Sequence, residues 1–202
     1  MPEVRAAERD DIAQIARTLA AAFHDDPVFQ FCFGDRDMST GLERFFRVLT
    51  PIHLQHHEVY VGTAVEGASL WDPPGHWKLS VRDQLRAAPS LLRTFGLRAP
   101  VLLADFARME KIHASQPSDH YYLAVLGTDP EHQGRGFGSA LMQPVLERAD
   151  ADGVGAYLES SKEANLAFYR RHGFEVVCEH AFHPGGPSVW PMWREPQPPG
   201  FR

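Results

Sequence analysis

The sequence predicts one domain of mixed α/β class, and three observations lead to this prediction. An apolar segment, 121–126, is followed by a glycine-rich loop, a helical pattern and a second strand-like segment, 156–159, which is the order of a βαβ unit. Two further pairs of strand-like segments, near 59–71 and 174–194, have the spacing of antiparallel hairpins. The chain has 202 residues, enough for one large domain, and its 44% hydrophobic and 23% charged residues are ordinary for a folded protein.

The N-terminal part is expected to contribute an edge strand and two amphipathic helices. Residues 2–7 have the composition of a short edge strand, and Asp10 is placed to cap a helix that runs to about Phe23. This helix is expected to end there because a His-Asp-Asp-Pro segment follows, and the residue before a proline avoids the α region. Residues 40–57 repeat apolar side chains at helical spacing, and Pro51 is expected to bend this helix or end it early.

A hairpin and a broken helical region are expected next. Strand-like segments at 59–61 and 68–71 flank a turn near 66–67. Residues 80–114 are helical in pattern, and 101–113 is the clearest helix within them. The breaks expected in this region lie at Pro89, Gly96 and Pro100.

The elements of the C-terminal half are predicted from apolar segments and from the glycines that begin or end helices. The segment 121–126 is typical of a central strand that is covered on both faces. The glycine loop leads into a helix that is expected to end near Ala151, and Gly173 has the position of the left-handed glycine that closes a helix. The other expected elements are a strand at 156–159, a helix at 163–172, antiparallel strands at 174–182 and 188–194, and a loose tail at 196–202, which leaves a single domain at 1–195.

Composition and charge argue against several classes of function. Twenty Lys and Arg residues against 26 Asp and Glu residues give a net charge of −6, so nucleic acid is not expected as a partner, whereas an amine is. No segment approaches the roughly 18 consecutive apolar residues of a membrane span, and the charged N-terminus lacks the apolar core of a signal peptide. Cys32 and Cys178 have no CxxC spacing and are expected to be buried free thiols. We therefore expect a cytoplasmic protein without a membrane partner.

The segment 129–138 is the strongest functional signal. Its alternating glycines, Gly134, Gly136 and Gly138, allow a ligand close to the backbone, and amides at a helix N-terminus attract a diphosphate. Arg135 can add a charge-assisted contact to a phosphate. A P-loop is excluded because no Gly-Lys-Ser/Thr follows. A dinucleotide site of the Rossmann type is the alternative, although the spacing is Gly-x-Gly-x-Gly and few residues remain for further parallel strands.

The loop resembles the acetyl-CoA pyrophosphate loop of the GCN5-related N-acetyltransferase (GNAT) superfamily. The matching residues are Gln133, Gly136 and Gly138 after Asp-Pro, together with a second signature in which a strand ending at 158–161 precedes 165–174. The likeness extends to the puromycin N-acetyltransferase branch. Its further matches are 17–23, Pro27, Pro144, Gly186, Pro187 and Trp190. Residues 76–118 show little that matches and are expected to shape the acceptor pocket.

The resemblance implies a mostly antiparallel mixed sheet of about seven strands, with a splayed parallel central pair and flanking helices. It also implies acetyl-CoA as co-substrate, with pantetheine added like a strand between the splayed strands. The residues that it assigns to the cofactor are Val125, Leu126, Gly127, Thr128, Gln133, Gly134, Arg135, Gly136, Phe137, Gly138, Ser139 and Asn165.

Two residues carry the expected chemistry. The resemblance assigns the role of general acid to Tyr169. A phenol suits this role, because it can protonate the leaving thiolate. Asn165, four residues earlier, shares its helix face. However, many relatives have a CoA-contacting asparagine where this chain has Lys162. Glu159 ends a splayed strand and is either the general base or a structural carboxylate; His120 is a second candidate base, and a neutral amine needs none.

These features predict an acetyl-CoA-dependent N-acetyltransferase that acts on a primary amine of a small molecule. Acetylation of a protein or peptide is an alternative, as is a non-catalytic acyl-CoA-binding or dinucleotide-binding module. No metal is expected, because His53, His56 and His57 are not accompanied by a matching set of cysteines or carboxylates. The chain itself is expected as a monomer or a homodimer.

Overall fold

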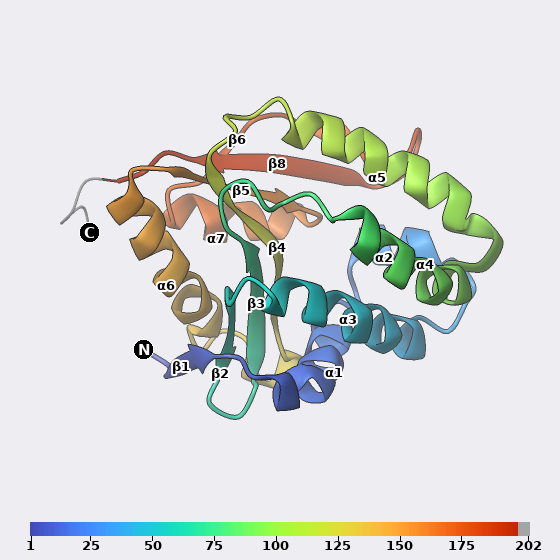
Figure 1. Ribbon diagram of the computed structural model, residues 1–202, viewed down its shortest axis with the longest axis horizontal. Coiled ribbons are helices and arrows are strands. Elements are labelled where there is room, and N and C mark those ends of the chain that lie inside the picture. Colours follow the sequence, from blue (N-terminus) through green and yellow to red (C-terminus); the bar gives the residue numbers. More distant parts are fainter. Residues whose placement is uncertain (198–202) are drawn as a thin grey trace.

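A central sheet runs through the protein and carries helices on both faces (Figure 1). The computed structural model describes residues 1–197, so 198–202 of the expected tail lie outside the described residues. The strands, in their order across the sheet, are β1 (Val4–Ala6), β2 (Val59–Gly62), β3 (Gly67–Asp72), β4 (His120–Thr128), β5 (Gly155–Ser160), β8 (Ser188–Arg194) and β6 (Glu175–Val176), with β7 (His180–Ala181) also paired to β8.

Seven α-helices accompany the sheet in the described part of the chain. They are α1 (Ile12–Ala22), α2 (Pro27–Phe33), α3 (Met38–Leu54), α4 (Val81–Phe95), α5 (Ala99–His113), α6 (Phe137–Asp152) and α7 (Leu166–Arg171). Within residues 1–197 only the β4–β5 pair is parallel, and the other pairs are antiparallel. The expected fold class, a mostly antiparallel mixed sheet with a parallel central pair, is therefore confirmed.

The start of α1 differs from the sequence expectation. The expected cap, Asp10, has no capping role; a 3-10 turn at Arg9–Asp11 precedes the helix instead. The Asp11 carboxylate accepts a 2.8 Å hydrogen bond from the Glu8 backbone N–H and is held by Arg5. Asp11, and not Asp10, therefore makes the hydrogen bond that stabilises this turn.

Helix α2 is absent from the sequence expectation. Asp26 caps it, because its Oδ1 accepts hydrogen bonds of 3.0 Å from the N–H groups of Val28 and Phe29, and Pro27 occupies its first turn. Phenylalanines alternate along this segment, and alternation does not predict a helix. Asp26 as the N-cap and Pro27 in the first turn are the two sequence signals that could have predicted this helix.

The expected breaks in 80–114 are correct at one position. Gly96 ends α4 with φ +58° and so separates the two helices. Pro89 lies inside α4 and does not break it, while Pro100 sits in the first turn of α5, where a missing N–H costs no hydrogen bond. Likewise, α3 continues through Pro51 to Leu54.

The expected long strand at 174–182 is divided into β6 and β7, both of which pair with β8. Cys178 lies in the interruption and is exposed, so the expectation of a buried thiol is correct for Cys32 and wrong for Cys178. In contrast, Gly173 has φ +86°, the left-handed conformation that its position predicts.

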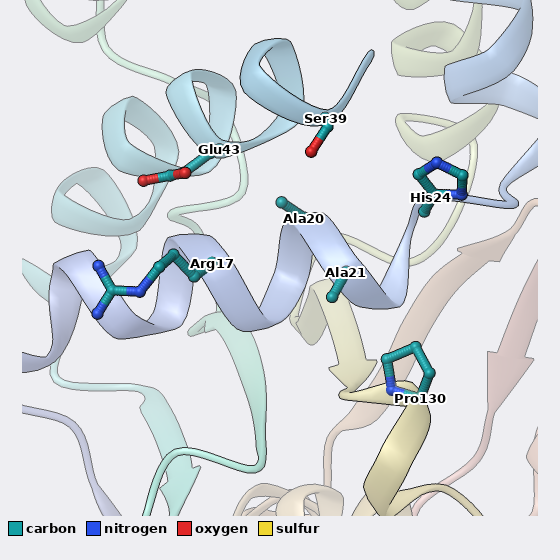
Figure 2. Close-up of a pocket in the computed structure, with 7 residues that line it drawn as sticks. All are labelled: Arg17, Ala20, Ala21, His24, Ser39, Glu43 and Pro130. Carbon is teal, nitrogen blue, oxygen red and sulfur yellow. The ribbon is translucent and has the colours of Figure 1, made fainter.

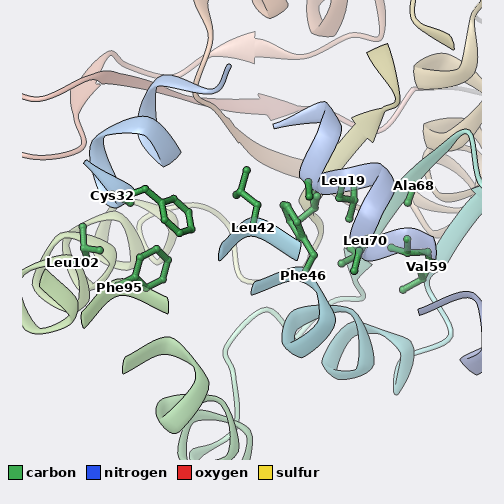
Figure 3. Close-up of a cluster of buried hydrophobic side chains, with 14 of the residues drawn as sticks. Leu19, Cys32, Leu42, Phe46, Val59, Ala68, Leu70, Phe95 and Leu102 are labelled. Carbon is green, nitrogen blue, oxygen red and sulfur yellow. The ribbon is translucent and has the colours of Figure 1, made fainter. Parts of the chain in front are cut away.

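Two hydrophobic clusters cover the sheet. The first packs α1, α2, α3 and part of the α4–α5 hairpin against β2 and β3; Figure 3 shows Leu19, Phe46 and Leu70 among its members. The second packs α6 and α7 against β4 and β5 through residues such as Met142, Leu158 and Tyr169. Burial of both faces explains why 121–126 is almost wholly apolar.

The register between β3 and β4 shows where the central strands separate. Leu70 is opposite Val125 and Trp71 is opposite Leu123, so Ala124 is an extra residue on β4, as in a β-bulge. The parallel pairing of β4 with β5 ends at Leu123 and Leu158, directly before this bulge. The two strands are therefore splayed beyond it, with the rest of β4 paired only to β3.

Candidate active site

A cavity of about 510 Å³ opens where β4 and β5 separate. The second half of β4, the glycine loop, the end of β5, the start of α7 and the α1–α2 loop all line it. Its lining includes the following residues expected from the sequence: Val125, Leu126, Gly127, Thr128, Gln133, Gly134, Gly136, Phe137, Gly138, Ser139, Glu159, Asn165 and Tyr169. The fold thus brings together segments that are up to 149 residues apart in the chain, from Ala22 to Arg171.

Backbone groups of β4 face this cavity. Residues 125–128 pair with β3 on one side, and no described strand pairs with them on the β5 side. This edge of β4 can accept an extended ligand through main-chain hydrogen bonds. At the end of the strand, the Gln133 side-chain Nε2 donates a 3.2 Å hydrogen bond to the Thr128 carbonyl.

The glycine loop delivers the N-terminus of α6 to the cavity. Gly134 and Gly136 have φ values of +73° and +86°, a region that other residues rarely adopt. Gly136 is the N-cap and supplies no side-chain acceptor, so the first N–H groups of this 16-residue helix are free for a ligand. These unbonded N–H groups, together with the helix dipole, make the start of the helix a site for an anion.

The cations around the cavity differ from the expectation. Arg135 is exposed and does not line it, whereas Lys162 and Arg171 do. Lys162 is bonded to Asp25, and beside it the Ser161 hydroxyl donates to Asp26, so the loop after β5 is tied to the α1–α2 loop. Arg171 lies within the 165–174 signature, one turn beyond Phe168 on α7, although it is not among the residues that the resemblance assigns to the cofactor.

Tyr169 and Asn165 lie on the same side of the α7 segment, and both line the cavity. Tyr169 is 8% exposed and packs in the second cluster, and its hydroxyl has no hydrogen-bond partner within residues 1–197. Burial, and then the nearby charge of Asp26, raises the pKa of the Tyr169 phenol above its usual range, so it stays protonated. Phe168, expected in the core, packs at the edge of the cluster and also lines the cavity.

Glu159 reaches the cavity from the other face of the sheet. Leu158 packs with Tyr169, and successive residues of a strand point to opposite faces. The Tyr122 hydroxyl donates a 2.8 Å hydrogen bond to Glu159 Oε2. Burial raises the pKa of the Glu159 carboxyl to about 7, and the hydrogen bond from Tyr122 limits the rise. A carboxyl with this pKa can exchange a proton at neutral pH.

His120, the second candidate base, lies away from the cavity. It is 1% exposed, and its ring is hydrogen-bonded to His113 and to the Pro117 carbonyl. Burial lowers the pKa of His120 below the usual range. Its ring nitrogens are thus occupied within the protein and do not meet a substrate directly.

A second hollow, of about 490 Å³, lies on the outside of α1 and α3 beside Pro130 (Figure 2). Its charged residues are already partnered, because Arg17 bonds to Gln14 and Glu43 bonds to Arg47. It contains no acid–base pair, and we assign no chemistry to it. Among residues 1–197 no cluster of His, Cys, Asp or Glu has the arrangement of a metal site, and no helix is long and apolar enough to cross a membrane.

Comparisons with known proteins point in one direction. The sequence model of the acetyltransferase (GNAT) family matches residues 69–174. An uncharacterized N-acetyltransferase of Schizosaccharomyces pombe is 29% identical over 185 residues, which cover 83% of this chain and 72% of that protein. A crystal structure described as histone acetyltransferase HPA2 and related acetyltransferase, from Corynebacterium glutamicum, has 26% identity and a TM-score of 0.69 over 98% of both chains. The polyamine N-acetyltransferase of Drosophila melanogaster, at 15% identity, shares the fold with a TM-score of 0.64 over 96% of this chain and 100% of that one.

Proposed function

The chain belongs to the acetyltransferase (GNAT) family, and we propose that it transfers an acetyl group from acetyl-CoA to a primary amine of a small molecule. The observation that carries this proposal is the cavity at the splayed strands, because it joins a backbone edge, an anion site and two proton-exchanging side chains. The narrower likeness to puromycin N-acetyltransferases remains a prediction from the sequence.

The co-substrate is proposed to lie along the cavity. Its diphosphate binds the N–H groups of Gly134 to Ser139 at the start of α6, and its pantetheine arm adds to the open edge of β4 at 125–128. Asn165 contacts the arm from the α7 side, and Arg135 approaches the phosphates from the exposed side of the loop. Lys162 and Arg171 add positive charge at the rim.

The reaction is proposed as a direct attack in a ternary complex. The neutral amine nitrogen bonds to the thioester carbon, and the carbon–sulfur bond breaks as the tetrahedral intermediate collapses. Glu159 accepts the proton that the nitrogen loses, and Tyr169 donates a proton to the departing thiolate. Both roles agree with the protonation states that burial favours, since the Tyr169 phenol is neutral and the Glu159 carboxyl has a pKa of about 7.

A small acceptor is supported by the segments that cover the Glu159 face. Helix α5 packs there through His113, which is buried. The loop before β8 is fastened to α5, because His183 Nδ1 lies 2.9 Å from Asp105 Oδ2, and the His183 ring packs on Phe31. A peptide acceptor needs an open groove, so the presence of these segments on this side supports a small acceptor.

Acetylation of a protein or peptide is the second candidate. It is supported by the likeness to the Corynebacterium glutamicum structure, whose description names a histone acetyltransferase. A non-catalytic acyl-CoA-binding or dinucleotide-binding module is the third candidate, and the presence of both Tyr169 and Glu159 in the cavity argues against it. We further propose a cytoplasmic location and a monomer or homodimer.

Thermal unfolding with candidate ligands tests the proposal. Acetyl-CoA at 100 times its Kd should stabilise the protein by about 2.7 kcal/mol, and NAD or ATP should not. Stabilisation by NAD alone would instead support a dinucleotide-binding module. Screens of an amine library and of a peptide library, both with acetyl-CoA and detection of free thiol, then separate the two acceptor classes.

A further inference from the structure

A chain of buried rings lies behind Glu159. His113, at the end of α5, and His120, at the start of β4, place their Nε2 atoms 2.7 Å apart. His120 Nδ1 lies 2.6 Å from the Pro117 carbonyl oxygen, and His113 Nδ1 lies 3.9 Å from Glu159 Oε1. The chain therefore runs from a backbone carbonyl through two imidazoles to the candidate base.

Aromatic packing holds the His113 ring in place. The Trp77 ring stacks on it at a centroid distance of 3.9 Å, and the Tyr157 ring stacks on it at 4.3 Å. Two rings cannot occupy the same face, so His113 is sandwiched between them. The two stacks hold the plane of the ring, and the hydrogen bond between His113 Nε2 and His120 fixes which edge of the ring faces Glu159.

The hydrogen bonds determine which nitrogen carries a proton. A carbonyl only accepts, so His120 Nδ1 must be the donor to Pro117. A neutral His120 then has a bare Nε2, and the proton between the two rings must belong to His113 Nε2. A neutral His113 consequently has a bare Nδ1, and its lone pair is the group that Glu159 meets.

Both rings are neutral at physiological pH. Burial, together with the nearby His120 and Lys78, lowers the pKa of His113 to about 3. Burial also lowers the pKa of His120. The tautomers above therefore apply to the protein in its working range.

We propose that His120 locks the tautomer of His113, and that His113 is thereby a positioning residue which presents a hydrogen-bond acceptor, not a donor, to Glu159. This inference rests on the proposed function, in which Glu159 is the base. A donor at this place would stabilise the carboxylate and weaken the base. A lone pair 3.9 Å from Oε1 instead repels the carboxylate and can accept a hydrogen bond once the protonated carboxyl moves closer, so it favours the form that Glu159 takes after it removes the proton from the amine.

His113 Nδ1 is a ring nitrogen that faces Glu159, and two tyrosine hydroxyls face the same carboxyl. Tyr122 donates to Oε2, and the Tyr157 hydroxyl, which makes no hydrogen bond of normal geometry in the described structure, faces the same carboxyl and also lowers its pKa. Lys78, a cation of this region, lies 3.6 Å from Glu110 and is largely exposed. The remaining titratable groups near this cluster are Asp119, which acts on His120, Asp72, which His53 binds, and Cys178.

Nitrogen-15 NMR of the histidine rings tests the lock without any activity measurement. In the unliganded protein between pH 6 and 8, His113 Nδ1 and His120 Nε2 should give signals of bare ring nitrogens, and the other two nitrogens should carry hydrogen. A proton on His113 Nδ1, in either a neutral or a charged ring, overturns the inference. Because this measurement uses the unaltered chain, it decides the question even where a variant does not fold.

A variant tests the consequence for Glu159. His120→Phe removes the acceptor from His113 Nε2, so the His113 proton should move to Nδ1 and donate to the carboxylate. The acid-side midpoint of kcat/KM should then fall by about one pH unit relative to the unaltered enzyme with the same amine. His56→Phe, which changes a histidine packed on His76 outside this chain of rings, should leave the midpoint unchanged. An unchanged midpoint in His120→Phe overturns the inference.

The two failures are distinguishable. If no amine is acetylated while the NMR signals are as expected, the proposed function fails and the lock stands as a structural fact. If acetylation occurs and the NMR signals show a proton on His113 Nδ1, the lock fails and the proposed function stands.

Discussion

Tyr169 and Glu159 line the same cavity from opposite faces of the sheet. Tyr169 packs with Leu158 in the cluster under α6 and α7, whereas Glu159, the next residue on β5, is hydrogen-bonded to Tyr122 on the other face. They meet at the cavity because β5 separates from β4 at this point. An acid for the thiolate and a base for the amine can thus act from two sides of one thioester.

Tyr169→Phe should lower turnover about 10²–10⁴-fold, because the departing thiolate loses its proton donor. Stabilisation by acetyl-CoA should be retained, since the ring and its packing remain. Steady-state kinetics and thermal unfolding measure the two effects. Tyr121→Phe is the matched control, because this hydroxyl bonds to Asp152 at the far end of β4; equal losses in both variants would remove Tyr169 as the acid.

Activity should depend on pH through Glu159. The base works when it is ionised, so kcat/KM should fall as the pH drops through about 7, the pKa of the buried carboxyl. Glu159→Gln should lower kcat/KM about 10²–10⁴-fold and abolish this acid limb. A pH profile measured with one amine for both proteins is the test, and an unchanged limb in the variant would show that another group titrates.

The same carboxyl should destabilise the folded protein at high pH. Its pKa rises from 4.5 to about 7 on folding, so the folded state binds more protons between these values and stability falls as pH rises through them. The ionised form then costs at most about 3 kcal/mol above pH 7. Glu159→Gln should escape this cost.

Thermal unfolding from pH 4 to pH 9 measures that difference. The advantage of Glu159→Gln over the unaltered protein should grow between about pH 4.5 and 7 and then remain constant. Glu163→Gln, at an exposed position on the turn before α7, is the control and should show no such growth. A constant difference for Glu159→Gln over the whole range contradicts the raised pKa.

Two glycines that flank α6 allow a matched test of the phosphate site. Gly136 and Gly153 both have left-handed φ values, +86° and +69°, so a valine strains the backbone at either position. Gly136→Val should abolish stabilisation by acetyl-CoA, because its side chain and the shifted loop block the diphosphate. Gly153→Val, at the other end of the helix, should lower stability and retain the response. Normal binding by the Gly136 variant would place the diphosphate elsewhere.

Some of the site could be predicted from local patterns because each pattern lies within one segment. The glycine loop, the start of α6 and Tyr169 on α7 are of this kind, and the structure brings them to one cavity. Arg135 is the exception, since it is exposed and does not line that cavity. Lys162 and Arg171 do line it; Lys162 stands where many relatives have a CoA-contacting asparagine and Arg171 lies within the 165–174 signature, but neither was assigned to the cofactor from the sequence.

Sequence patterns alone were sufficient for the mixed α/β class, the order of most elements, the family resemblance and the glycine-loop site, because these depend on residues close together in the chain. Contacts between distant segments decide the rest. The bulge at Ala124, which opens the β4–β5 splay, exists only as a register between β3 and β4. The pKa of Glu159 and the direction of the His113 lone pair depend on burial under α5 and on hydrogen bonds to β4. Neither burial nor proton placement is a property of one segment, so the tertiary structure was needed to find both.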